Sequence, residues 1–469
     1  MLKRFRWRWA LVLALMISGC AVKQDKDVRI YRDVLDSGKS GPAVSFHPED
    51  PLTLKAALGL ANAQNEQLAM SGENYLQALI DKDRALAAFL PAIHFDAIFM
   101  HQKKTALAAD NPLIAALAPE TTADMPLAGD MDLHPFRDIP ALQSAGSSAK
   151  IQQAKLLDHQ AILLLDVAGL YFQVMRSEKQ VQVLRHSLEV DRRRLGDIRM
   201  KEASGVARPV DVALCEAQLA KTRNMLIAAQ DDVKNSRAML AFLIGVPELS
   251  GPLVNGLTVP STDWRTDALL EMADKNRQDL IVEQERVKAA ANALEAAWGE
   301  YFPSVSLNLT RYLSRDTAPS DVDWTSLIQV HVPIFSAGLI HADVRTAYSR
   351  LRQARLAESY ARRQVLKDLR LAVENIQGDD QQMNQLRVQV AAAREGARQA
   401  EAAFNAGLGT HLEKLTAQDA LLSAELDLST ARFNRNIDYV RLLRVTGVLN
   451  PELSVTLSSD ENNLHEARK

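Results

Sequence analysis

The chain has 469 residues, with 55 lysines and arginines against 58 aspartates and glutamates, and a formal net charge of −3. A sequence pI of about 6.4 gives no basic footprint, which argues against a nucleic-acid partner. Aromatic residues make up only 5% of the chain, a composition more typical of long helices than of a compact α/β core.

The N-terminus has the features of an export signal. Lysine and arginine recur in residues 3–8, the apolar run Ala10–Ile17 follows, and Ser18 and Gly19 lead to Cys20. This order is typical of a secretory signal, and the run is shorter than the roughly 18 residues that a membrane-spanning helix requires. We therefore expect residues 1–19 to be a signal peptide. Cys20 would then be the first residue of the mature chain, and Cys215 the single cysteine of the folded domain, so no internal disulfide is expected there.

The rest of the chain repeats one pattern twice: an opening helix, strand, loop, strand, a very long helix, a glycine-containing turn and a return helix. Such internal repetition makes the fold a property of the repeat unit. The expected divisions are an N-terminal extension over 20–51, a first copy over 52–246, a proline-rich connection over 247–265, a second copy over 266–447 and a tail over 448–469.

The strands alternate in hydrophobicity. In Ser304–Tyr312, Val305, Leu307 and Leu309 share one face, and polar side chains take the other. This pattern is typical of a transmembrane β-barrel, although a half-buried strand of a soluble sandwich has the same period. The four expected strands cover about 91–101, 127–137, 304–314 and 324–334.

Four strands cannot close a barrel alone, because about eight is the usual minimum and an open edge is not viable in lipid. We therefore expect several chains to share one barrel. The loop 103–126 between the first two strands is expected at the cell surface, and its sequence indicates no role.

The helices carry heptad repeats on both sides of each glycine-containing turn, which predicts two antiparallel coiled-coil hairpins. The expected spans are 54–89 and 266–302 for the opening helices, 144–204 and 337–406 for the long helices, and 210–244 and 411–447 for the return helices.

Several polar residues fall within these heptad seams. Cys215 lies on the d row of its helix, where a small buried hydrophobe is favoured over a reactive thiol, and Asp419 occupies an a position. Asp379 and Asn436 are both at d positions and lie opposite each other when counted outward from the turn. This placement predicts a hydrogen-bonded pair that fixes helix register.

With these features in place, the chain resembles the TolC family of trimeric outer-membrane efflux and secretion channels over residues 52–449. Residues 205–219, a glycine followed by Asp-Val and then Ala-Gln-Leu, are similar to the family's first hairpin tip. Val332–Gly338 is similar to its strand-to-helix junction, and Ile139–Gly146 repeats that junction more loosely.

The N-terminal signal resembles that of a bacterial lipoprotein, because Ile17-Ser18-Gly19-Cys20 is similar to a lipobox. This resemblance implies that Cys20 becomes the lipidated first residue of the mature chain. The absence of an aspartate at Ala21 implies outer-membrane localisation. The alternative is an ordinary secretory signal that contains a cysteine by chance.

The family resemblance implies a mainly α fold with a transmembrane β-barrel. Three chains would form a twelve-stranded barrel, continued by a twelve-helix coiled-coil α-barrel across the periplasm. It also implies a homotrimeric passive duct without catalysis or cofactor, whose energy comes from an inner-membrane pump with a periplasmic adaptor. The sequence agrees, because it contains no phosphate loop, no nucleophile–base pair and no helical His pair of metal-ligand spacing.

The resemblance also places a periplasmic gate just past the second tip. Glu413 takes the position of the first gate acid, whereas Thr416 stands where the second acid would be, so a single carboxylate ring is expected. The alternative is a solvated carboxylate that is favourable near the N-terminus of a helix. Asp211 matches the acid of the first tip, but Gly409 replaces the arginine that it would meet.

The two tips, at about 204–210 and 406–412, are the expected adaptor-docking surface. Gly205 and Gly407 can adopt positive φ to turn the chain, and helix ends leave backbone groups free for a partner. A purely structural turn is the alternative role for these residues.

A lipid-anchored periplasmic coiled-coil adaptor or tether without a pore is the alternative function. Heat-modifiable migration and protease-protected hairpins in outer membranes would decide between the two. Within the channel interpretation, drugs, metal ions and secreted polypeptides are equally compatible cargoes, because the pump selects the cargo.

Overall fold

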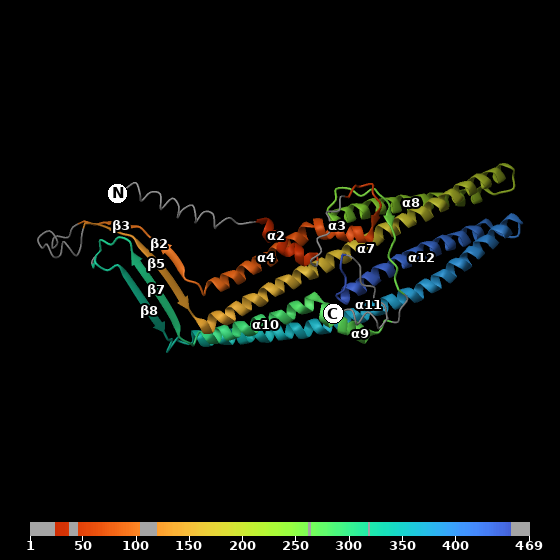
Figure 1. The fold of residues 1–469 in the computed structure, drawn as a ribbon. Helices are drawn as coiled ribbons and strands as arrows, with labels where there is room; N and C mark the ends of the chain where they lie inside the picture. Colours follow the sequence, from red (N-terminus) through yellow and green to blue (C-terminus); the bar gives the residue numbers. More distant parts are fainter. Residues whose placement is uncertain (1–23, 37–45, 104–119, 261–263, 318, 452–469) are drawn as a thin grey trace. The chain divides into compact units, whose positions relative to one another are not determined.

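The computed structural model describes residues 24–36, 46–103, 120–260, 264–317 and 319–451 (Figure 1). The expected signal peptide, Cys20, most of the loop 103–126 and most of the tail 448–469 lie outside these ranges. The chain divides into two compact units. The strand unit comprises Asn74–Ala154 and Ile281–Ala361, and the hairpin unit comprises Met1–Glu73, Lys155–Leu280 and Arg362–Lys469.

The helices confirm the expected duplication. The opening helices have 11 and 22 residues in both copies, the long helices 69 and 67, and the return helices 36 and 35. Among the described residues, no helix is both long and apolar enough to cross a membrane. The bounds are α3 Leu54–Gln64, α4 Glu66–Ala87, α7 Pro135–Ala203 and α8 Pro209–Ile244 in the first copy, and α9 Thr266–Asn276, α10 Gln278–Gly299, α11 Leu339–Asn405 and α12 His411–Val445 in the second.

The opening helices differ from the expectation, because each is interrupted once at the equivalent place. Asn65 and Arg277 both have extended backbones, with ψ of 120° and 114°. At Asn65 the side-chain oxygen accepts a hydrogen bond from the Leu68 amide at 3.0 Å. A single residue therefore ends one helix and caps the next, which a continuous apolar periodicity does not reveal.

In the strand unit, four antiparallel strands form a sheet in the order β2, β5, β7, β8. A separate antiparallel pair joins β3 and β4. The register places Asp130 opposite Asn308, and Leu307 opposite Ile328. The bounds are β2 Ala92–Phe95, β3 Ile98–His101, β4 Thr121–Asp124, β5 Pro126–Leu133, β7 Ser304–Tyr312 and β8 Trp324–His331.

Two strand expectations are corrected. The strand expected over 91–101 is divided into β2 and β3, because residues 96–97 leave the ladder. The strand expected over 127–137 ends at Leu133, and α7 begins at Pro135, well before the expected start at residue 144. Proline is favoured at the first helical position, where its missing amide donor costs nothing. The Asp138 carboxylate also accepts a hydrogen bond from the His134 amide at 3.0 Å, which fixes this helix start.

The two faces of the sheet differ as the alternation predicted. Apolar side chains of neighbouring strands share one exposed face, including Ile93, Leu309 and Ile328. On the other face the Asp130 carboxylate accepts a hydrogen bond from the Asn308 amide and lies 3.4 Å from the His94 ring. A polar network therefore runs across one side of the sheet, and an apolar band across the other.

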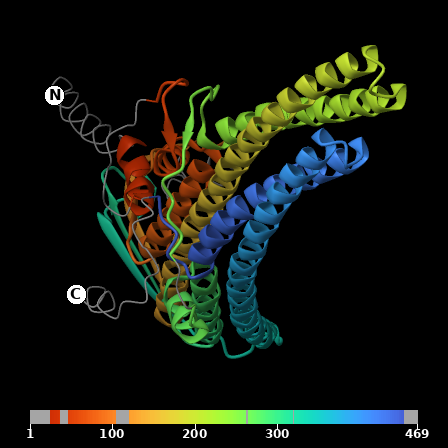
Figure 2. The same ribbon diagram turned by 90° about the vertical axis from the view of Figure 1, so that its right-hand side faces the viewer.

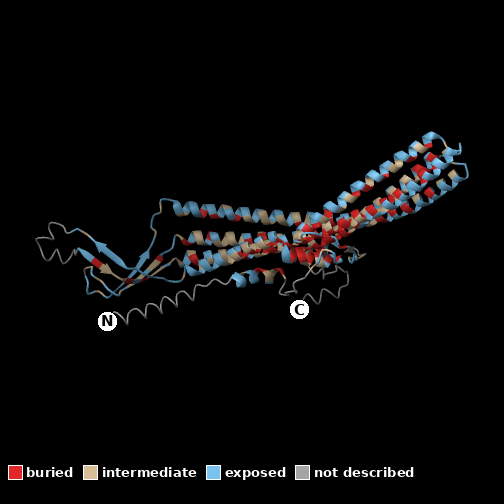
Figure 3. Ribbon diagram, turned by 90° about the horizontal axis from the view of Figure 1, so that it is seen from above, coloured by how far each residue is buried: buried red, intermediate tan, exposed pale blue. Residues whose placement is uncertain are grey.

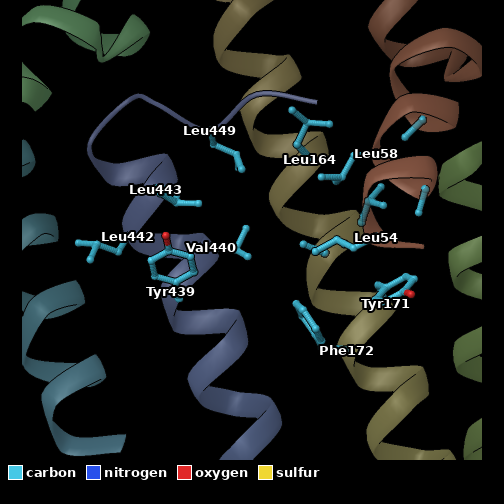
Figure 4. Packing of buried hydrophobic residues seen from close by; sticks show 14 of the residues in the cluster. Leu54, Leu58, Leu164, Tyr171, Phe172, Tyr439, Val440, Leu442, Leu443 and Leu449 are labelled. Atoms are coloured by element: carbon cyan, nitrogen blue, oxygen red, sulfur yellow. The ribbon is translucent and has the colours of Figure 1, made fainter. Parts of the chain in front are cut away.

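The hairpin unit contains the largest apolar core. Buried side chains of α3, α7, α8, α11 and α12 form one cluster, here called the middle cluster. Figure 4 shows Val440 and Leu443 of α12 facing Leu164 and Phe172 of α7, with Leu58 of α3 on the far side of α7. Figure 3 shows buried residues gathered in this region, while the hairpins beyond it are largely exposed.

The connection between the copies joins the same cluster. β1 (Leu52–Thr53) pairs in parallel with β6 (Leu253–Val254). The fully buried Tyr171 hydroxyl lies 2.8 Å from the Leu52 carbonyl oxygen and 2.7 Å from that of Val254. A helix not expected from sequence, α2 (Gln24–Leu35), buries Tyr31 and Leu35 against this unit.

The predicted pair of Asp379 and Asn436 is wrong. Asp379 Oδ2 is buried and has no hydrogen-bond partner among the described residues, and Asn436, although buried, supplies none. Instead the Asp379 carboxyl lies beside that of Asp438, and burial together with this neighbour raises the pKa of Asp379 to about 7. The heptad count placed the correct helices together but displaced the contact by two residues.

Candidate functional site at the hairpin tips

The candidate site is the pair of hairpin tips in the hairpin unit. Figure 2 shows α7 beside α8 and α11 beside α12 along the two hairpins. The first tip connects Ala203 to Pro209, and the second connects Asn405 to His411. These connections agree with the expected spans of 204–210 and 406–412.

Both tips turn through glycine, as expected. Gly205 has a φ of 73° and Gly407 a φ of 74°, the left-handed region that favours glycine. The Val206 amide donates to the Lys201 carbonyl at 2.9 Å, and the Leu408 amide donates to the Ala403 carbonyl at 2.9 Å. The residue after each glycine projects outward, with Val206 77% and Leu408 87% exposed.

Gly409 does not have a positive φ, and its lack of a side chain allows close packing against α11. A Cβ at this position would lie 3.2 Å from the Ala403 Cβ and 3.3 Å from the Phe404 amide nitrogen. A larger residue here would therefore press on the last turn of α11. This is a steric reason for glycine at the position where the family resemblance led us to look for an arginine.

Asp211 is held by its own helix start. Its carboxylate accepts a hydrogen bond from the Arg208 amide at 3.2 Å and two from the Arg208 guanidinium, at 3.1 Å and 2.9 Å. These bonds lower the pKa of Asp211 and keep it ionised. The partner of this acid is therefore in the same tip, three residues away.

Glu413 forms the equivalent cap of α12. Its carboxylate accepts a hydrogen bond from the Thr410 amide at 2.7 Å, and its amide donates to the Thr410 hydroxyl at 3.2 Å. The backbone bond lowers the pKa of Glu413. This is a capping box, a more specific role than the solvated helix-end carboxylate that was the alternative for Glu413. Thr416 is exposed and its hydroxyl donates to the Leu412 carbonyl at 2.9 Å within the same helix.

The two hairpins meet through α8 and α12. The Cys215 Sγ lies 2.9 Å from the His411 Nε2, and both side chains are buried. Two turns farther along, the Asp419 carboxylate accepts hydrogen bonds from Gln218 at 2.6 Å and from Lys221 at 2.8 Å. We call this set of five residues the α8–α12 contact.

Burial sets the charge state of the thiol and the imidazole in this contact. It raises the pKa of Cys215 and lowers the pKa of His411, so both groups are neutral near pH 7. The thiol can then donate its proton to Nε2 of the imidazole. The other ring nitrogen of His411 is buried and has no hydrogen-bond partner among the described residues.

Apolar and cation–π packing completes the region. Phe404 of α11 packs against Leu195, Ile198 and Cys215 of the first hairpin. The Lys201 ammonium lies 5.0 Å from the centre of the Phe404 ring. Beside it is a cavity of about 340 Å³ whose lining includes Arg194, Lys201 and His411.

Sequence reasoning missed the partnership across the two hairpins. Cys215 was correctly expected to be buried, but its neighbour His411 was not singled out. A charged residue at an a position, Asp419, was the one available signal. Among the described residues, no group of three or more metal-ligating side chains could hold a metal ion.

Comparisons with known proteins agree with this architecture. The family model described as outer membrane efflux protein matches residues 57–246 and 269–448. Outer membrane protein TolC of Escherichia coli is 23% identical, over 68% of this chain and 68% of its own length. Cation efflux system protein CusC of the same organism is 23% identical, over 61% of this chain and 64% of its own length.

Solved structures show the same fold. The crystal structure of the outer membrane protein VceC from Vibrio cholerae matches with a TM-score of 0.74 at 18% identity, covering 84% of this chain and 96% of VceC. The family model covers both copies of the repeat, including all four helices that meet at the tips. The chain belongs to the outer membrane efflux protein family.

Proposed function

We propose that this chain is the passive outer-membrane exit duct of a tripartite export system, working with a periplasmic adaptor and an inner-membrane pump. The observation that carries the proposal is the match of both repeat copies to the outer membrane efflux protein family. Members of this family are channel proteins, so the pump and not this chain would supply the energy and choose the cargo.

The duct is a homotrimer with a shared barrel. The four-stranded sheet ends on β2 and β8, and its apolar face is exposed. Since an open sheet edge is not viable in lipid, three copies would supply twelve strands to close one barrel. Exposed apolar side chains along the helices, such as Phe242 (74%) and Val388 (65%), give further surface for other copies to cover.

The tips are the periplasmic end. Their apices Val206 and Leu408 are exposed and apolar, which suits docking of an adaptor on the turns that Gly205, Gly407 and Gly409 shape. Glu413 is exposed and ionised, so three copies would place a ring of carboxylates near the entrance, with Thr416 one turn farther in. Asp211 would preserve the shape of the first tip.

Cys20 is the proposed lipid anchor. Acylation of this residue would fasten the N-terminal extension to the outer membrane beside the barrel. Labelling cells with a radioactive or clickable fatty acid tests it, because wild-type chain should carry the label and Cys20→Ala should not.

The experiment that tests the function combines assembly and transport. The native mass of detergent-extracted protein should equal three copies, and cross-linking in cells should capture an adaptor and a pump. Deleting the gene should raise sensitivity to at least one class of exported compound, and the wild-type gene should restore resistance. A monomer, or unchanged sensitivity across drugs, metal ions and secreted polypeptides, would contradict the proposal.

A further inference from the structure

The cavity beside the α8–α12 contact has the size of a small ligand site. Its volume of about 340 Å³ is within the range of small-molecule pockets. One side is formed by α7 of the first hairpin, and the other by the end of α11 and the start of α12. Side chains from three helices of the hairpin unit therefore converge on one space.

Two buried side chains of the lining have a donor without an acceptor. Arg194 is 8% exposed and its Nη1 donates to Asp191 at 3.2 Å, but its Nε has no hydrogen-bond partner among the described residues. His411 is 4% exposed. Where its Nε2 accepts the Cys215 thiol proton, its Nδ1 carries the ring proton, and that nitrogen has no partner in the described part of the chain. Buried donors without acceptors are unfavourable, so both nitrogens remain to be satisfied.

A third free donor lies on the exposed side of the cavity. The Lys201 ammonium lies 5.0 Å from the centre of the Phe404 ring and has no hydrogen bond or ion pair among the residues that the structure describes. Its side chain is exposed and flexible enough to turn toward a ligand. Donors from both hairpins are thus available to one ligand.

The acids of the lining do not occupy these donors. The Glu401 carboxylate is paired with Lys414, whose Nζ lies 2.8 Å away. Asp197 is exposed, so water weakens the effect of its charge. The remaining cation of the lining, Arg193, is paired at the surface with Glu189. Each of the lining's two carboxylates is therefore either neutralised by a lysine or solvated.

The surroundings of His411 are positively charged on the cavity side. Burial lowers the pKa of His411, and the charges of Arg194, Lys414 and Lys201 lower it further, whereas Asp211 opposes them. The imidazole is therefore neutral near pH 7. A negative charge placed in the cavity would be attracted by the same three cations.

We propose that this cavity binds a small oxyanion, of the phosphate or carboxylate class, held by Arg194 Nε, His411 Nδ1 and the Lys201 ammonium. An oxyanion accepts several hydrogen bonds at once and bonds to charged donors strongly. An apolar ligand would leave all three donors unsatisfied. Such a site belongs to one chain, so it goes beyond the proposed function and does not depend on assembly or transport.

Equilibrium dialysis of the purified full-length protein tests the site directly. Radiolabelled inorganic phosphate is one probe, and radiolabelled acetate, in a parallel series, represents carboxylates. At neutral pH and constant ionic strength, we expect saturable binding of at least one of the two anions, with a single site per chain. The tighter of the two identifies which kind of oxyanion the cavity takes, and saturable binding of neither would overturn the proposal.

The decisive variant is Lys201→Met, which removes the exposed donor and leaves the buried lining in place. The matched control is Arg199→Met, which removes the same charge from the same helix. Arg199 lies outside the lining and is paired with Glu216 of α8. We expect Lys201→Met to raise the dissociation constant about fivefold or more, and Arg199→Met to change it less than about twofold. An equal increase in both variants would indicate a general charge effect and would contradict a built site.

His411→Phe tests a buried donor, because phenylalanine keeps an aromatic ring but has no ring nitrogen. We expect weaker binding, by about fivefold or more, and wild-type affinity in this variant would exclude the assigned site. Since Lys201 is exposed, Lys201→Met should fold even if His411→Phe does not, and the comparison with Arg199→Met then decides. Dialysis requires no pore, so a failure of the proposed duct appears separately, as absent trimers or transport.

Discussion

The middle cluster and the tips of the hairpin unit are held together by different physics. In the middle cluster, Leu164, Phe172 and Leu240 are fully buried among other apolar side chains. At the tips, three buried residues, Leu195, Ile198 and Cys215, form the apolar contact, and hydrogen bonds supply the rest. Apolar burial is therefore concentrated in the middle cluster, so we expect separating the helices at the tips to cost less free energy than separating them in the middle.

The largest expected effect tests the stability of the middle. Phe172→Ala removes a fully buried ring and should lower the free energy of unfolding by about 3–5 kcal/mol. The matched tip variant Cys215→Ala should cost about 1 kcal/mol, because it deletes one small side chain and one hydrogen bond. Denaturant unfolding of the detergent-solubilised protein measures both. A tip variant as costly as the middle variant would reverse the comparison.

A pH experiment sharpens the boundary between the two regions. The pKa of Asp379 is raised to about 7, so folding favours its protonated form. Its contribution to stability is present below the ordinary pKa and is lost as pH rises toward 7. Asp379→Asn should therefore gain about 1–2 kcal/mol at pH 8 relative to the wild type, allowing for solvent screening. At pH 4 the two proteins should differ little, and an equal gain at both pH values would exclude this titration as the cause.

Most of the fold could be predicted because it depends on local periodicity. The duplicated helices, both hairpins and the turns at Gly205 and Gly407 follow from heptads and glycine placement. The interruptions of the opening helices at Asn65 and Arg277 could not be predicted, because a single extended residue leaves the apolar periodicity on either side of it unchanged.

The candidate site was less predictable because it depends on contacts remote in sequence. Heptads show which face of a helix is buried, but not that Cys215 meets His411, 196 residues away. The family resemblance pointed to Asp211 and Glu413 as tip and gate acids. In the structure, each carboxylate caps the start of its own helix. The capping residues of α12 do have a signal in the sequence, which is a threonine followed three residues later by a glutamate.

A cap variant tests whether the tip is locally marginal. Thr410→Ala removes the hydroxyl that accepts from the Glu413 amide and should cost about 1 kcal/mol. Because the middle cluster is unaffected, the loss should appear as faster hydrogen exchange in the first turn of α12, with little change around Phe172. Thr416→Ala, which removes a hydroxyl bonded only within the helix, is the control and should leave exchange unchanged.

The smallest expected effect concerns His411. Burial lowers its pKa, with Arg194, Lys201 and Lys414 nearby acting in the same direction and Asp211 opposing them. The stability that its neutral form contributes is present above the ordinary pKa of histidine and is lost as pH falls through the lowered pKa. Opening of the tips, measured as hydrogen exchange relative to the intrinsic exchange rate at each pH, should therefore rise about twofold to threefold on acidification. In His411→Gln this rise should be absent; if it persists, another group is responsible.

The most direct test of the proposed duct is single-channel recording from purified protein in planar bilayers. The wild-type protein should form pores with a discrete conductance. The absence of pores in bilayers that contain the folded protein would contradict the proposed duct.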